Sequence, residues 1–128
     1  DADMIYGDES LLVVDDRVDV TKMLKNMLSQ FGYKITAFND SMEALQEYRQ
    51  HSDQYDLIFT DFSMPKMTGL ELSQEIRKIN KNIPIMIATG NFAKVDRKQL
   101  AQISKCKLIS KPILIFEVSK TIREILDE

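Results

Sequence analysis

Short apolar runs alternate with segments of helical periodicity along almost the whole chain. The runs contain few polar residues, which is typical of parallel strands that are covered on both faces. Polar or turn-forming residues bound each run. Five strands are therefore predicted, at residues 11–14, 33–38, 56–60, 83–89 and 107–110.

The segments between the runs predict helices. After the first run, apolar residues recur at the spacing of one buried helix face, and Gly32 follows as a stop. Two more helices begin at capping boxes, DSME at 40–43 and TGLE at 68–71, where side chains satisfy unpaired backbone donors. The segment 95–104 has a weaker stripe of apolar residues and predicts a further helix. The two clearest apolar faces consist of Val20, Met23, Leu24, Met27, Leu28 and Phe31, and of Ile115, Val118, Ile122, Ile125 and Leu126.

This alternation predicts the fold class. A strand followed by a helix, repeated five times, is typical of an α/β domain with a doubly wound parallel sheet and right-handed crossovers. At 128 residues, the chain has the usual length of one domain. We expect that domain over residues 10–128, with a polar linker or tail at residues 1–9.

Polar residues follow most of the predicted strands. In a doubly wound sheet, ligands bind beyond the carboxyl ends of the strands, so these residues are the candidates for a site. The second strand ends in Phe38 and Asn39 and is expected to contribute nothing comparable. The residues that should converge on one rim are Asp15, Asp16, Asp61, Thr89 and Lys111.

The three carboxylates of this rim predict a metal site. Like charges a few Å apart raise one another's pKa, and a hard divalent cation relieves the repulsion. Mg2+ fits best, because a calcium loop would place its ligands within about 12 residues. Lys111 and Thr89 could then bind the remaining oxygens of a phosphoryl group, which a free carboxylate could attack.

Composition and charge narrow the expected partners. The formal net charge of −3 provides no broad basic surface, so direct binding to nucleic acid is not expected. The single cysteine, Cys106, cannot form an intrachain disulfide, and no apolar stretch has the length of a membrane span. We therefore expect a cytoplasmic domain that makes no membrane contact of its own.

The chain resembles the receiver domains of response regulators in bacterial two-component signalling. The resemblance covers nearly the whole chain and implies a five-stranded, flavodoxin-like sheet of order 2-1-3-4-5 with five helices. The segments that carry it are LLVVDD at 11–16, DLIFTDFSMPKMTGLEL at 56–72, IMIATG at 85–90 and KLISKPI at 107–113.

The resemblance implies a role for each acid of the rim. Asp61 would be the phosphoacceptor, and the donor would be a phosphohistidine on a histidine kinase or a histidine phosphotransfer domain. Asp15 and Asp16 would bind Mg2+ together with Asp61 and the backbone carbonyl of Ser63. Such a domain catalyses its own phosphorylation, and its full-length parent could be a histidine kinase.

Residues on the other loops of the rim receive roles from the same resemblance. Lys111 would contact the phosphoryl group, and Thr89 would be the switch hydroxyl that moves toward it. Ser63 and Asn91 would flank the path of the water that removes the phosphoryl group. A cis peptide before Pro112 would direct Lys111 into the rim, at a cost of only about 0.5–1 kcal/mol before proline.

Two positions depart from the usual receiver pattern. Arg17 stands where many receivers have Glu after the acid pair, and its positive charge is expected to weaken metal binding. Leu108 stands where many have an aromatic switch residue, so coupling through the fifth strand by ring rotation is not available.

Simpler interpretations exist for each residue taken alone. Adjacent aspartates commonly cap helices, and most lysines are surface residues. Two other functions remain as alternatives, a Mg2+-dependent phosphohydrolase with an aspartate nucleophile, and a degenerate receiver that acts only as a protein-binding module. His51 has no neighbouring His or Cys in the sequence and is expected to be a solvent-facing loop residue.

The ends of the sequence suggest a context. The short lead-in before LLVVDD and the end soon after TIREILDE resemble the terminal receiver of a hybrid sensor histidine kinase. We therefore expect a fragment of such a protein, with a stand-alone regulator as the alternative. The sequence predicts no oligomeric state.

Overall fold

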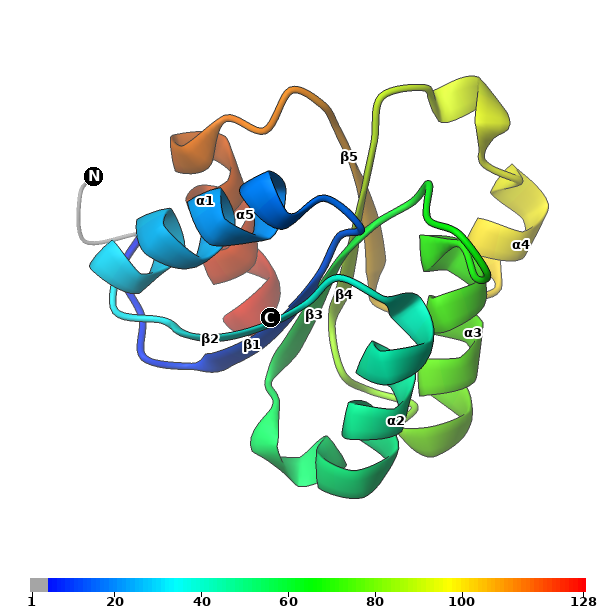
Figure 1. The fold of residues 1–128 in the computed structure, drawn as a ribbon, viewed down its shortest axis with the longest axis horizontal. Helices are drawn as coiled ribbons and strands as arrows, with labels where there is room; N and C mark the ends of the chain where they lie inside the picture. The colour runs from blue at the N-terminus through cyan, green and yellow to red at the C-terminus, as the bar shows by residue number, and fades with distance from the viewer. Residues whose placement is uncertain (1–4) are drawn as a thin grey trace.

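A five-stranded parallel sheet forms the centre of the protein (Figure 1). The computed structural model describes residues 5–128. The strand order is β2-β1-β3-β4-β5, as the sequence predicts, and each strand lies within two residues of its predicted bounds. The strands are β1 (Ser10–Val14), β2 (Lys34–Phe38), β3 (Leu57–Asp61), β4 (Ile85–Thr89) and β5 (Cys106–Ser110).

Helices cover both faces of this sheet (Figure 1). Helices α1 and α5 pack on one face, while α2, α3 and the segment around α4 pack on the other. Two short 3-10 helices, η2 and η3, follow α2 and β4. The helices are α1 (Val18–Gln30), α2 (Ser41–His51), η2 (Ser52–Gln54), α3 (Gly69–Ile79), η3 (Phe92–Lys94), α4 (Arg97–Ala101) and α5 (Ile115–Leu126).

Strand β1 lies between the two cores. Its apolar residues alternate between them, since Leu12 and Val14 face the α2/α3 side and Leu11 and Val13 face the α1/α5 side. All four are completely buried. Burying such side chains stabilises a fold by about 1.5–3 kcal/mol each, so the central strands hold the rim in place.

Two details of the helix predictions are corrected by the structure. The helix expected over 95–104 contains only Arg97–Ala101, because Asp96 caps its start and the backbone leaves the helix after Ala101. The capping box predicted at α3 is complete, with Thr68 and Glu71 bonded reciprocally. At α2, only the Asp40 half of the predicted box is present, with its carboxylate accepting from two backbone N–H groups.

The lead-in before β1 contacts the body of the domain. The Gly7 N–H donates to the carbonyl oxygen of Phe31 at 3.0 Å, and Arg123 of α5 forms an ion pair with Glu9. The predicted linker or tail at residues 1–9 stays a prediction, and residues 1–4 lie outside the described part of the chain. Within residues 5–128, no helix combines the length and the apolar character that a membrane crossing needs.

Gly69, the first residue of α3, provides a test of how closely the fold packs against the rim. A Cβ at this position would overlap the carbonyl oxygen of Asp61. We predict that Gly69→Ala lowers the free energy of unfolding by about 1–3 kcal/mol, because the β3 backbone must move. Urea denaturation measures this change. Gly90→Ala is the control, since a Cβ there meets no atom within 4 Å; equal stabilities of the two variants would contradict the prediction.

Candidate functional site

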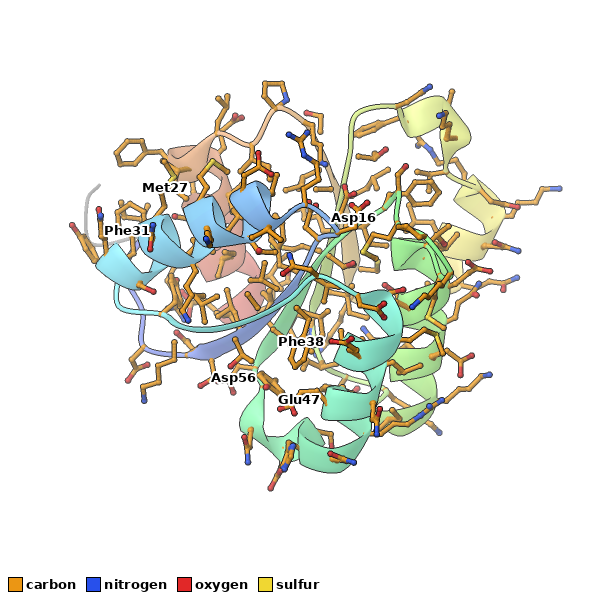
Figure 2. All side chains as sticks on the ribbon, viewed as in Figure 1. Asp16, Met27, Phe31, Phe38, Glu47 and Asp56 are labelled. Carbon is orange, nitrogen blue, oxygen red and sulfur yellow. The ribbon has the colours of Figure 1, made fainter. Side chains whose placement is uncertain are left out.

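The carboxyl ends of four strands bring the predicted polar residues together. Asp15 and Asp16 follow β1, and Asp61 is the last residue of β3. One carboxylate oxygen from each of these three residues lies within 4.8 Å of the other two. Thr89 ends β4 and Lys111 follows β5 at the same rim. Figure 2 shows Asp16 at this end of the sheet.

The three carboxylates differ in their exposure to solvent. Asp15 and Asp61 are only 3% and 5% exposed, whereas Asp16 is exposed. Burial raises the pKa of Asp15 to about 6, although the backbone N–H of Arg17, which donates to Asp15 Oδ1 at 2.9 Å, acts in the opposite direction. The negative charge of Asp61 raises this pKa further. In the absence of a metal, the site therefore favours a proton on Asp15 at mildly acidic pH.

Lys111 provides the positive charge of the rim. Its Nζ lies 2.7 Å from Asp61 Oδ1 and 3.8 Å from Asp15 Oδ2. The predicted cis peptide between Lys111 and Pro112 is present. The Lys111 N–H also donates to the carbonyl oxygen of Thr89 at 2.9 Å, so the last bond between β4 and β5 fixes the lysine backbone at the rim.

The Thr89 hydroxyl is bonded to the loop that follows it. This hydroxyl accepts from the backbone N–H of Asn91 at 3.1 Å and donates to the Asn91 carbonyl at 3.2 Å. The Asn91 side chain in turn accepts from the Ala93 N–H and so caps η3. Movement of the threonine hydroxyl would therefore break bonds that hold the start of the β4–α4 connection.

The remaining predicted residues surround this cluster. Ser63 is exposed in the turn after β3. The exposed Arg17 guanidinium pairs with Asp19 at 3.1 Å, so part of its charge is already compensated. Leu108 lines a hollow of about 250 Å³ that Phe92 also borders, on the side of β5 next to α5.

Asn39 is a residue of the site that the sequence analysis missed. Its Nδ2 donates to the carbonyl oxygen of Asp15 at 2.8 Å and to the Thr21 hydroxyl at 2.9 Å. The expectation that the second strand contributes nothing comparable was therefore wrong. The signal was available, because Asn39 directly follows β2 and the carboxyl ends of parallel strands share one edge.

His51 lies at the carboxyl end of α2, whereas the residues of the cluster lie at the carboxyl ends of strands. It is the last residue of the helix rather than a loop residue, which corrects the expectation from sequence. Its Nδ1 lies 3.2 Å from Glu47 Oε1, and the Tyr55 hydroxyl donates to the other oxygen of the same carboxylate at 2.6 Å. These contacts tie the end of α2 to the chain before β3.

The donor set of the rim fits a small hard cation. The candidate ligands are carboxylate and carbonyl oxygens, the type of donor that Mg2+ prefers, and Mg2+ typically takes one or two carboxylates and keeps several waters. The exposed Asp16 leaves the cluster open to solvent on one side. A cation there would also favour the ionised form of Asp15, whose pKa is raised chiefly by burial and further by the neighbouring carboxylates.

The match to a protein family decides what this arrangement is. The model of the response regulator receiver domain matches residues 11–123. The chain belongs to this family. Receiver domains are components of two-component signalling, and the predicted sheet order is that of their flavodoxin-like fold. The relation to receivers predicted from LLVVDD and the other segments is thus confirmed.

Relatives of this receiver domain include both regulators and sensor kinases. It is 33% identical to the transcriptional regulatory protein CpxR homolog of Haemophilus influenzae over 91% of this chain and 49% of that protein. It is 33% identical to the sensor protein EvgS of Escherichia coli over 88% of this chain but 9% of that protein. The chain spans about half the length of the first of these and a small part of the second.

Solved structures have the same fold as this receiver domain. A response regulator receiver domain protein from Clostridium thermocellum superposes with a TM-score of 0.84 at 26% identity, covering 93% of this chain and 94% of that one. The response regulator TrrA from Thermotoga maritima, solved in complex with Mg(2+)-BeF, gives 0.81 at 27% identity, covering 91% and 98%.

The raised pKa of Asp15 gives a testable effect on stability. The carboxyl binds its proton more tightly in the folded chain, with a pKa of about 6 against an ordinary value of 3.8. Metal-free stability therefore falls as the pH rises through this window. We predict that Asp15→Asn stabilises the metal-free domain at pH 7 by about 1–2 kcal/mol, and that the gain disappears below about pH 4.

Thermal and urea unfolding in chelator at several pH values would measure this gain. Asp16→Asn is the control, because that carboxylate is exposed and its change should stay within about 0.5 kcal/mol. An Asp15→Asn variant that is less stable than the unmodified domain at pH 7 would contradict the prediction.

Proposed function

We propose that this receiver domain binds Mg2+ and accepts one phosphoryl group on Asp61. The observation that carries the proposal is the position of this carboxylate, which is nearly buried, paired with Lys111 at 2.7 Å and flanked by two further carboxylates within 4.8 Å. Asp15, Asp16 and the backbone carbonyl of Ser63 would complete the protein ligands of the metal with Asp61.

The proposed metal has a defined role in the chemistry. Bound Mg2+ would neutralise the charge that gathers on the phosphoryl oxygens and on the attacking carboxylate. The fit of the oxygen donors supports this role, and TrrA, with the same fold, was solved with Mg(2+)-BeF. Arg17 is expected to weaken the binding of the metal only slightly, because Asp19 compensates part of its charge.

The residues of the rim would then transfer the phosphoryl group in line. A carboxylate oxygen of Asp61 forms a bond to phosphorus while the bond from phosphorus to the donor histidine nitrogen breaks. The electron pair of that bond stays on the imidazole, which takes up a proton. The Lys111 ammonium, which is paired with Asp61 in the structure, would then pair with a phosphoryl oxygen. Catalysis would come from the positioning of the reacting groups and the compensation of their charge.

The phosphorylated state would signal through Thr89. The acylphosphate adds negative charge and oxygen acceptors to the rim. If the Thr89 hydroxyl donates to one of these oxygens, it no longer donates to the Asn91 carbonyl, which loosens the loop that leads to α4. Since Leu108 replaces an aromatic ring, this loop is the proposed path of the signal.

The family match also bears on the alternatives. It covers residues 11–123, which supports a receiver rather than a phosphohydrolase, and the complete set of rim residues supports an active receiver rather than a degenerate one. We propose a histidine kinase or a histidine phosphotransfer domain as the phosphodonor. We also propose a cytoplasmic setting, within a hybrid histidine kinase or in a stand-alone regulator.

Phosphorylation of Asp61 is the direct test. We predict that a small phosphodonor such as acetyl phosphate gives one phosphoryl adduct per chain in the presence of Mg2+ and none in chelator, as measured by intact mass. Asp61→Asn should abolish the adduct. Asp56→Asn is the matched control, because Asp56 lies next to the amino end of β3, away from the rim (Figure 2). An adduct that persists in Asp61→Asn would contradict the assignment.

The lifetime of the adduct tests the residues beside it. We predict that Ser63→Ala and Asn91→Ala change the rate of dephosphorylation at least roughly twofold, a small change in the barrier, and change the rate of phosphorylation less. The reason is that both residues flank the proposed path of the attacking water. Decay of the adduct measured by mass gives the rates, with the exposed Ser29→Ala as control. Unchanged decay in both variants would exclude this role.

A further inference from the structure

The loop between β3 and α3 carries a strained residue close to the proposed metal site. Lys66 has a φ of +71°, in the left-handed region that is unfavourable for side-chain residues other than Asn and Asp. The same loop contains Ser63, whose carbonyl is a proposed metal ligand. A conformation of this kind persists only where contacts hold it in place.

One such contact comes from the start of α2. The Lys66 Nζ lies 2.8 Å from Asp40 Oδ2. The other oxygen of this carboxylate, Oδ1, accepts from the N–H groups of Met42 at 2.8 Å and Glu43 at 3.1 Å, so Asp40 caps the helix. Because both oxygens are engaged, the carboxylate offers Lys66 a fixed anchor.

The start of α2 is also tied to the other wall of the site. The neighbour of Asp40 in the chain is Asn39, whose side chain holds the carbonyl oxygen of Asp15 at 2.8 Å. The Ser41 hydroxyl donates to the carbonyl of Pro65 at 3.4 Å, a second contact to the β3–α3 loop. Three consecutive residues after β2 thus join the backbone beside Asp15 to the loop that carries Ser63.

We propose that Asp40 and Lys66 are positioning residues for the metal site, which hold the β3–α3 loop so that the Ser63 carbonyl stays in place beside Asp15 and Asp61. This inference rests on the proposed function, since it concerns the affinity of that site for Mg2+. The ion pair is partly exposed, with side-chain exposures of 62% for Lys66 and 26% for Asp40. Such pairs are individually weak, so a moderate effect on affinity is expected.

Removing Lys66 should change the affinity for Mg2+ in opposite directions, depending on whether this residue positions the loop or acts only through its charge. If the ammonium acted only through long-range repulsion, its removal would strengthen the binding of a cation. If it holds the loop, its removal weakens binding although a positive charge is lost. Lys66→Gly is the informative variant, because glycine adopts a positive φ without strain.

The experiment compares Mg2+ titrations of the unmodified domain with those of Lys66→Gly, Asp40→Asn and the double variant, by calorimetry or by amide chemical shifts. Asparagine also caps helices well, so Asp40→Asn removes the charge while keeping the cap. We expect each single variant to bind Mg2+ roughly two- to fivefold more weakly. The double variant should be little weaker than either single one, because both remove the same interaction.

Two further measurements exclude a merely structural effect. Lys66→Arg should restore the affinity, and amide hydrogen exchange in residues 62–68 of the metal-free domain should be faster in Lys66→Gly than in the unmodified domain. Lys78→Gln is the matched control, because it breaks a similarly exposed ion pair of 2.8 Å, with Glu75, that does not touch the loop. Salt near 1 M should narrow the differences between variants.

Each outcome decides a separate point. Lys66→Gly binding as tightly as the unmodified domain, or more tightly, would overturn the positioning role and leave the proposed function intact. Failure of the unmodified domain to bind Mg2+ would overturn the proposed function and this inference with it. Weaker binding in both single variants, without additivity and with normal binding in Lys78→Gln, would support the positioning role.

Discussion

The burial of two neighbouring carboxylates, those of Asp15 and Asp61, is the constraint on which the rest of the site depends. Both groups are almost fully buried. One carboxylate oxygen from each of them and one from Asp16 lie within 4.8 Å of one another. Lys111 compensates part of this charge, since its ammonium lies close to Asp61 and farther from Asp15. Burial raises the pKa of Asp15 to about 6, and the negative charge of Asp61 adds to this effect. A divalent cation at this site would offset the repulsion between the carboxylates.

The fold makes this unfavourable cluster possible. Parallel strands with apolar side chains on both faces form a sheet whose central strands the helices bury, and its stability comes from the two cores rather than from the rim. The rim can therefore hold strained and repelling groups. The tight approach of Gly69 to the backbone of Asp61 fixes this residue from one side. On the other side, Asn39 fixes the backbone of Asp15.

Each loop of the rim connects the acid cluster to a different part of the molecule. Thr89 is bonded to Asn91 and so to the start of η3 and the segment before α4. The β3–α3 loop is tied through Lys66 to the cap of α2. A change of charge at Asp61 would thus act on hydrogen bonds and ion pairs that are already formed. In this way a local electrostatic event can alter distant surfaces.

The sequence by itself determined the elements and most of the site. The apolar runs predicted the buried strands, and the apolar stripes predicted α1 and α5. The resemblance to receivers added the correct sheet order. Because ligands bind at the carboxyl ends of parallel strands, the residues that follow the strands predicted the site: Asp15, Asp16, Asp61, Thr89 and Lys111. The short length of α4 was not predicted from the sequence. Val95 and Ile103 are buried just outside that helix, at a spacing that continues its apolar face. Only the tertiary structure decided that Asn39 bonds to the Asp15 carbonyl and that Asp40 pairs with Lys66. These contacts join segments 24 or 26 residues apart, and their geometry depends on how the loops pack rather than on any local pattern.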